Sequence, residues 1–407
     1  MKKLIAVCAV LLFVAPAFAA DWAWYGSERV GTWYTQRDNG SQDNMAGGQV
    51  NNQGDDAAAQ WNFATNARVG ARVKADKVNG RIELRLSTGS DGYSASNSGD
   101  TSVGTRLAWG EWKFSDNASL KIGKMDSTAT NILNNRMFAD DDEMLGKGQF
   151  YGGRPAGFEL NIGNFALGAF TPKVGGDVNA FTGSQLGVNA GSGVNGLYAT
   201  TTNGEGDAYF PKLEARYKLD LGAGYIQPFG GFQWYKIAPS GTGTINDRLD
   251  VYSAVGGVGT QWNIGAFTIG AEVSYGMNMG NAGWATNYNQ VGQTSSFSSN
   301  AYLKPKAGGK TDIADVYSTQ ASLVGALKFT DTLRFETGVG YRVDNADGAP
   351  GYSQKDDALT YYVQCMITLA PGVNVIPEVG YIDYMQDRTA NDEGYQWYAG
   401  AKWQIDF

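Results

Sequence analysis

WNFATNARVGARVK, residues 61–74, is the stretch that indicates most clearly how this chain folds. Its odd positions are apolar or small, whereas its even positions are mostly polar and include Arg68, Arg72 and Lys74. Successive side chains of a β-strand point to opposite faces, so one face of this strand is apolar and the other is basic. After the short connection 75–80, apolar residues alternate in the same way with Arg81, Glu83 and Arg85.

The same two-residue period recurs along the rest of the chain. It is clear at 267–277, 333–343, 359–369 and 395–407. No segment keeps apolar residues at the i, i+3, i+4 and i+7 spacing of an amphipathic helix, so we expect few and short helices.

The connections between these strands alternate in length. Short turns are expected near 75–80, 115–118, 163, 220–222, 263–265, 330–331 and 370–372. Long polar connections are expected near 37–59, 88–102, 126–149, 173–206, 238–249, 280–312, 344–357 and 386–394. These fifteen connections separate sixteen strands, and both chain ends fall on the short-turn side. We therefore predict an all-β fold, a closed antiparallel transmembrane β-barrel of sixteen strands.

The charged residues decide which face of each strand points inward. An arginine placed in lipid near the middle of a membrane costs about 2 to 4 kcal/mol, so the face with Arg68 and Arg72 must line the interior. In the last strand, Trp397 and Phe407 lie on the outward face. The ten steps between them span roughly 33 Å of strand, or about 25 Å of height at a 40° tilt, which is the height of the lipid-facing band of a barrel.

The N-terminus has the pattern of a secretory signal peptide. Lys2 and Lys3 precede an apolar run, Leu4–Val14, and the small residues Ala17-Phe18-Ala19 follow. We expect cleavage after residue 19 and a single barrel domain over 20–407. Loss of two lysines lowers the formal charge from −8 to −10, which argues against a nucleic-acid partner.

The composition excludes several kinds of chemistry. The sequence has no histidine, and Cys365 is the only cysteine left once the signal peptide with Cys8 is removed. Histidine-dependent nucleophilic catalysis, histidine metal ligands and an intramolecular disulfide are thereby excluded. We expect no enzymatic activity, no cofactor and no metal site. No apolar run beyond the signal peptide reaches the roughly 18 residues of a membrane-spanning helix, whereas strands of a barrel need none.

Three segments resemble the general bacterial porins, the trimeric sixteen-stranded channels of the outer membrane. They are WYGSERVGTWY (24–34), TRLAWGEWKFSDNASLKIGKMDS (105–127) and the terminal Phe407. The resemblance implies a homotrimer in the outer membrane of a Gram-negative bacterium, in contact with lipid and lipopolysaccharide. It further implies a third loop folded into the lumen, and a terminal Phe407 that the barrel-assembly machinery reads. The family's short Pro-Glu-Phe signature in that loop is absent here.

A dense acidic run lies in the third long connection. RMFADDDEMLGKG, residues 136–148, contains Asp140, Asp141, Asp142 and Glu143 in succession. If this loop folds inward as the resemblance implies, the four acids face inward-pointing arginines across a constriction. Those arginines are Arg68, Arg72, Arg81, Arg85 and Arg106. Such opposed charges set up a transverse field in a water-filled pore. A solvated loop and a calcium site are the alternatives, although consecutive acids lack the spacing of a calcium loop.

These features indicate a porin that forms a water-filled channel for passive diffusion of small hydrophilic solutes and ions. The alternative is a solute-specific channel for an anion or a sugar, with a saturable binding site. An outer-membrane barrel enzyme and a plugged, adhesive surface barrel are further alternatives, and the absence of histidine argues against the first of these.

Overall fold

The computed structural model of the protein describes most of the chain as β-structure. The described residues are 20–38, 57–63, 67–88, 101–134, 144–174, 206–237, 248–284, 299–306, 310–346, 355–386, 392 and 394–407. Their only helix is a short 3-10 turn, η2 (Met279–Ala282). None of their helices is long and apolar enough to cross a membrane.

The strands follow one another in a simple order. In the first half they are β1 (Asp21–Asp38), β2 (Ala57–Phe63), β3 (Ala67–Lys74), β4 (Val78–Thr88), β5 (Thr101–Ser115), β6 (Ala118–Lys124), β7 (Ala156–Ile162), β8 (Phe165–Phe170), β9 (Gly206–Ala208), β10 (Lys212–Tyr217) and β11 (Leu219–Asp220). In the second half they are β12 (Gly224–Ile237), β13 (Leu249–Ile264), β14 (Phe267–Met277), β15 (Tyr302–Lys306), β16 (Lys310–Ala314), β17 (Val316–Lys328), β18 (Leu333–Ala346), β19 (Asp356–Ala370), β20 (Val373–Asp383) and β21 (Tyr395–Asp406).

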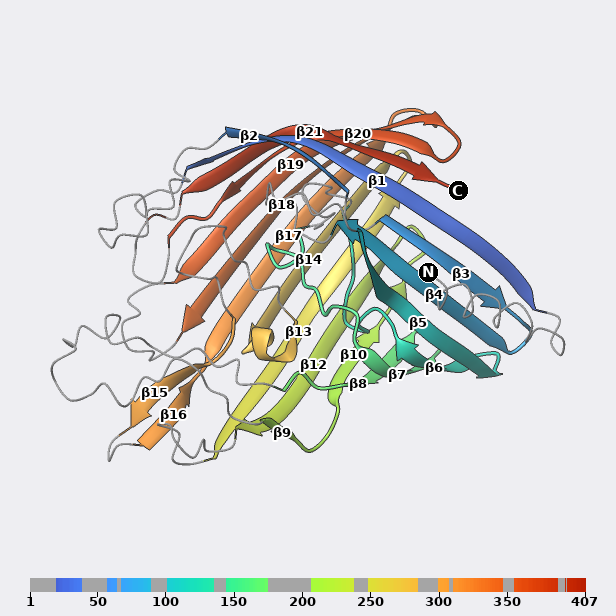
Figure 1. Ribbon diagram of the computed structural model, residues 1–407. Coiled ribbons are helices and arrows are strands. Elements are labelled where there is room, and N and C mark those ends of the chain that lie inside the picture. The colour runs from blue at the N-terminus through green and yellow to red at the C-terminus, as the bar shows by residue number, and fades with distance from the viewer. Residues whose placement is uncertain are drawn as a thin grey trace.

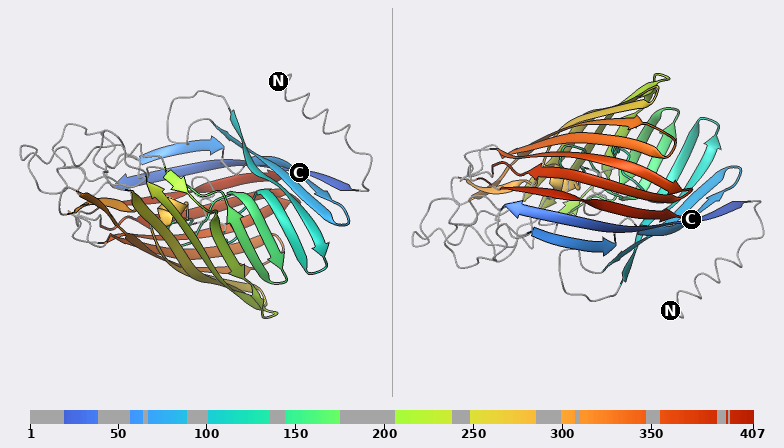
Figure 2. Two further views of the ribbon diagram at one scale, coloured as in Figure 1. Left: turned by 90° about the horizontal axis from the view of Figure 1, so that it is seen from below. Right: turned by 90° about the horizontal axis from the view of Figure 1, so that it is seen from above.

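The described strands close into one barrel (Figure 1). β2 and β3 both pair with β1 and form one barrel strand, and β9, β10 and β11 form another against β12. The short hairpin β15–β16 stands apart from the barrel sheet. Counted in this way, the described part of the barrel has sixteen strands, and each pairs antiparallel with the next along the chain. β21 closes the ring by pairing with β1, from Asp406↔Ser27 to Tyr395↔Asp38. The views from the two sides show the wall continuing around the barrel (Figure 2). The predicted fold class is confirmed.

All seven predicted short turns are present. β3 and β4 are joined through residues 75–77, and β19 and β20 through residues 371–372. The first described strand begins at this rim, since Asp21 lies opposite Lys74. The chain also ends there, because the backbone N–H of Phe407 donates to Gly26 O and the Gly26 N–H donates to Phe407 O.

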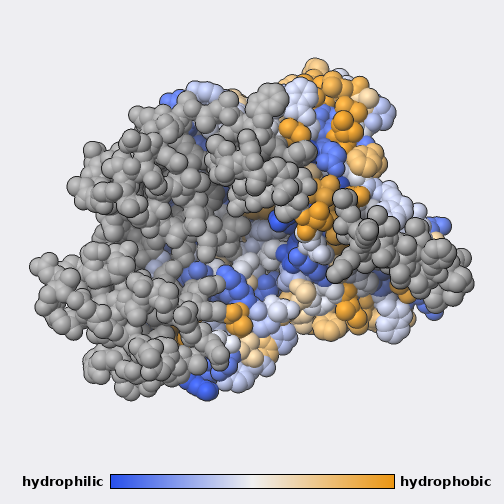
Figure 3. All heavy atoms as spheres, in the orientation of Figure 1, coloured by the Kyte–Doolittle hydropathy of each residue, from blue (hydrophilic) through white to orange (hydrophobic). Residues whose placement is uncertain are grey.

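The two faces of the wall differ as the alternation predicts. Val258 and Val273 lie opposite each other on β13 and β14, and both are exposed on the outside. The neighbouring Glu272 and Ser274 are buried on the inside. In the space-filling view, apolar side chains gather over the outer surface of the barrel wall (Figure 3). A shift of one residue in register would exchange these faces, so the burial of one face fixes the register.

A β-bulge interrupts the alternation on β5. The pairing with β4 shifts between Glu83↔Leu107 and Leu84↔Thr105, which leaves Arg106 as an extra residue. A bulge places two residues of one strand opposite one residue of its partner and redirects a side chain. Both Arg106 and Leu107 are therefore turned toward Glu83, on the inside of the barrel.

Candidate channel constriction

Four arginines form two pairs on the inner face of β3 and β4. Arg68 lies directly opposite Arg85, and Arg72 lies opposite Arg81. Like charges placed opposite each other on a sheet destabilise it unless something compensates them. We refer to these four residues together with Arg106 as the arginine wall.

Glu83 supplies the compensation. Its carboxylate is fully buried between the two arginine pairs and lies 2.6 Å from Arg81 NH2 and 3.7 Å from Arg68 NH1. Arg106 NH1 donates to the same carboxylate. The Tyr25 hydroxyl donates to Glu83 Oε2 at 2.7 Å and accepts from Arg81 Nε at 2.8 Å. One carboxylate thus holds three guanidinium groups and leaves the wall positive.

The remaining two arginines are open to solvent. The Arg72 guanidinium lies 4.9 Å from the centre of the Tyr25 ring, a distance at which a cation is attracted to the ring face. Arg72 and Arg85 are both exposed, and neither forms an ion pair with the described residues. Exposed side chains on the inner face mean that water reaches the interior along this wall.

The inward-pointing arginines were predicted from the sequence, whereas no role was predicted for Glu83. The signal was present, because Glu83 has the same parity as Arg81 and Arg85. A glutamate at the centre of an inward arginine group was predictable as their counter-ion. The inward direction of Arg106 depends on the bulge, which strand alternation does not reveal.

The third loop connects β6 and β7, and its described residues, 125–134 and 144–155, run into the barrel. Its first arm is held by buried glutamates of the wall: Ser127 Oγ donates to Glu214 Oε2 at 2.5 Å, and Thr128 Oγ1 donates to Glu159 Oε2 at 2.7 Å. On its return arm the Phe150 N–H donates to Glu272 Oε1 at 2.7 Å. Farther round the wall, Arg342 NH1 donates to the carbonyl of Gly146 at 2.9 Å.

Three of these four anchors lie across the ring from the arginine wall, whereas Glu159 lies on β7, nearer to it. Glu214, Glu272 and Arg342 lie on β10, β14 and β18, which are the eighth, eleventh and thirteenth strands around the sixteen-stranded ring. The arginine wall occupies the second to fourth strands, half a ring away. The interior between them is bounded by the arginine wall on one side and by the described part of the third loop on the other.

The acidic run Asp140–Glu143 lies within 135–143, outside the described residues. The residues on either side of this gap are tied to the loop and to the wall. Asn134 Nδ2 donates to Gln149 Oε1 at 2.5 Å, and Met144 packs in a buried cluster with Leu133, Val324 and Tyr362. The segment that carries the acids therefore starts and ends beside the wall that faces the arginines.

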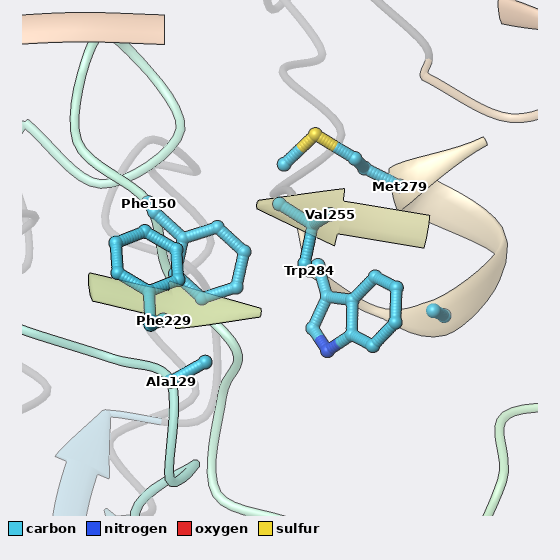
Figure 4. Packing of buried hydrophobic residues seen from close by; sticks show 7 residues of the cluster. Ala129, Phe150, Phe229, Val255, Met279 and Trp284 are labelled. Carbon is cyan, nitrogen blue, oxygen red and sulfur yellow. The ribbon is translucent and has the colours of Figure 1, made fainter. Parts of the chain in front are cut away.

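A second segment of the chain also enters the barrel. Residues 278–284, between β14 and the β15–β16 hairpin, include η2 and the fully buried Trp284. Trp284, Met279 and Ala282 pack with Ala129 and Phe150 of the third loop (Figure 4). Phe229 and Val255 of the wall complete the cluster. Residues 280–312 were predicted only as a polar connection, although Trp284 within this range was a signal of burial.

Phe407 lies on the outside of the barrel, 70% exposed, as the parity of the last strand predicts. A Cβ atom at Gly26 would collide with its ring, so glycine allows the terminal side chain to lie across β1. Among the described residues, no group of three acidic, cysteine or histidine side chains could hold a metal ion.

Known family models and curated protein sequences give no match to this chain. Solved structures match along nearly its whole length. The outer membrane channel DcaP of Acinetobacter baumannii superposes with a TM-score of 0.62 at 16% identity, covering 95% of this chain and 97% of that one. OmpF of Salmonella typhi, in complex with daunomycin, gives a TM-score of 0.54 at 13% identity, with 94% and 97% covered.

A third structure adds the same result. The anion-selective porin from Comamonas acidovorans superposes with a TM-score of 0.53 at 12% identity, covering 95% of this chain and all of that one. The chain has the sixteen-stranded fold of the outer-membrane porins. As predicted, the described part of the third long connection turns inward.

Proposed function

We propose that the protein is an outer-membrane porin, a water-filled channel for passive diffusion of small hydrophilic solutes and ions. One observation carries the proposal: a closed barrel with an apolar outer face has solvent-exposed arginines on its inner face. Charged residues that have no ion-pair partner are stable on the inside of a lipid-embedded barrel where water reaches them. The solute undergoes no chemical change, in keeping with the lack of histidine in the sequence.

The proposed setting is the outer membrane of a Gram-negative bacterium, reached by export with cleavage of residues 1–19. The outward Val258, Val273 and their neighbours would contact lipid, and lipopolysaccharide would cover the rim with the long loops. The exposed, terminal Phe407 would be read by the barrel-assembly machinery. Assembly as a homotrimer completes this proposal.

Planar-bilayer recording tests the proposed function directly. Purified protein should give stepwise, ohmic conductance increments, and the same preparation unfolded by boiling should give none. A folded barrel, verified by its heat-dependent mobility on gels, that inserts without any conductance would refute the proposal.

The acidic run should influence which ions pass. We predict that neutralising Asp140, Asp141, Asp142 and Glu143 together shifts permeability toward anions. Each charge contributes about 0.5 kcal/mol at about 8 Å in water, and physiological salt screens over about 8 Å, so the four charges together should change the anion-to-cation permeability ratio on the order of tenfold. The reversal potential in a salt gradient measures it. Asp331→Asn, at an exposed short turn, is the matched control, and an unchanged reversal potential in the quadruple variant would make the run a solvated outer loop.

A solute-specific anion channel is the second candidate function. The observation that favours it is that Arg72 and Arg85 have no acidic partner among the described residues and remain free to bind an oxyanion. Such a channel would saturate, so single-channel current carried by an organic anion would reach a plateau with concentration. A current that stays proportional to concentration would favour the general porin.

A further inference from the structure

Glu214 joins the two segments that enter the barrel. Its carboxylate is 1% exposed, and each oxygen accepts from a different segment. Oε2 accepts from Ser127 Oγ at 2.5 Å and from the Ala129 N–H at 3.3 Å, both in the third loop. Oε1 accepts from Trp284 Nε1 at 2.8 Å, in the second segment.

The second segment is itself firmly attached to the wall beside Glu214. Lys212 Nζ donates to the carbonyl of Ala282 at 3.2 Å and lies 3.3 Å from Glu214 Oε1. Gln233 Nε2 donates to the Asn281 carbonyl at 3.2 Å. The Trp284 ring lies where a side chain of residue 231 would be, because a Cβ atom at Gly231 would overlap it. The wall is therefore shaped to receive this segment.

Apolar packing also joins the two segments, next to the hydrogen bonds of Glu214. Ala129 and Phe150 of the third loop and Met279 and Trp284 of the second segment belong to one buried cluster (Figure 4). The Phe150 and Phe229 ring centres are 4.9 Å apart, within the range of favourable aromatic contact. If either segment moved away, the other would expose apolar surface and leave a buried polar atom unpaired. Both consequences are unfavourable.

We propose that residues 278–284 are a second constriction element and that Glu214 is the positioning residue that holds it and the third loop as one unit. The inference rests on the proposed channel function, because it adds a second determinant of the width of that channel. The two segments then have only two joint arrangements, both held or both displaced. A change at one segment must alter the position of the other.

Trp284→Phe tests this coupling with little change in packing. It removes the indole N–H donor to Glu214 and keeps an aromatic ring in the cluster. A spin label on Ile132→Cys, an exposed position of the third loop, in a Cys365→Ala background, reports on the loop without any need for conductance. Loss of one hydrogen bond should raise the mobile fraction of this label about fivefold. Trp33→Phe is the matched control, since Trp33 is also buried but packs on Tyr398 in another part of the wall.

An unchanged label in Trp284→Phe would overturn the coupling, whether or not the wild-type protein conducts. Bilayer recording separates this result from the proposed function. Trp284→Phe and Ser127→Ala should both populate the same conductance substate, each about fivefold more often than the wild type. Two different substates would mean that the segments move independently. Absence of conductance in the wild type would refute the channel and leave the label experiment to decide the coupling.

Discussion

Glu83→Gln is expected to destabilise the barrel by about 3 kcal/mol, because removal of one partner from a buried ion pair costs about 3 to 5 kcal/mol. The carboxylate is buried beneath Arg68, Arg81 and Arg106, whose side chains keep 13–22% of their surface exposed. This solvation of the arginines places the expected value at the low end of the range. The amide can accept on one atom only, so either Arg81 and the Tyr25 hydroxyl, which share Oε2, or Arg68 and Arg106, which share Oε1, lose their acceptor.

The same variant should become more selective for anions. Loss of the only carboxylate that contacts the arginine wall among the described residues raises the positive charge along the lumen. One charge that lies about 8 Å from a passing ion, in water with physiological salt, changes the anion-to-cation permeability ratio by about twofold. Urea unfolding followed by tryptophan fluorescence measures the stability, and the reversal potential in a salt gradient measures the selectivity.

Glu111→Gln is the matched control for Glu83→Gln. Glu111 lies on the neighbouring β5 and faces inward, but it is bound by Asn79 and Ser119 and contacts no arginine. We expect a loss of at most about 1 kcal/mol there, the usual contribution of a single hydrogen bond. An equal decrease in the free energy of unfolding in both variants would mean that Glu83 does not organise the arginine wall.

The second large effect should come from charge placed on the outer face. Val258 lies near the middle of β13 and is exposed on the outside, so Val258→Arg would place a guanidinium in lipid. This substitution should lower the free energy of unfolding by about 2 to 4 kcal/mol. Gln261→Arg, three residues along the same strand and on the inner face, should cost less than about 1 kcal/mol.

Folding into lipid vesicles across a urea series gives both values. The comparison is sensitive because the two positions share a strand and differ in the face they occupy. Similar losses at both positions would contradict the assignment of the outer face to lipid.

The barrel could be predicted from the sequence because it depends on two local features, the alternation of side chains along a strand and the residues of the turns. Alternation along a strand shows which face each residue occupies, and turn residues show where strands end. The turns at 75–77 and 371–372 could therefore be predicted. The position of Phe407 followed from the same parity. These features depend on neighbours in the chain and not on contacts across the barrel.

Contacts across the barrel could not be predicted from the alternation of side chains, because alternation shows only which face a residue occupies. Parity places Glu214 and Glu272 inside, but it does not say that a loop more than sixty residues away binds both. The bulge that turns Arg106 inward depends on the pairing of β4 with β5. The entry of Trp284 into the barrel depends on a space at Gly231 in a distant strand. The signal peptide and the role of the acidic run stay predictions, since both lie outside the described residues.

Accessibility of alternate residues on β3 tests the central claim most directly. Single cysteines replace Arg68, Val69, Arg72 and Val73 in turn, in a Cys365→Ala background, and the folded protein in vesicles is treated with a membrane-impermeant thiol reagent. Cysteines at 68 and 72 should react because they line a water-filled interior, and those at 69 and 73 should be protected by lipid. Reaction at 69 and 73 with protection at 68 and 72 would contradict the account.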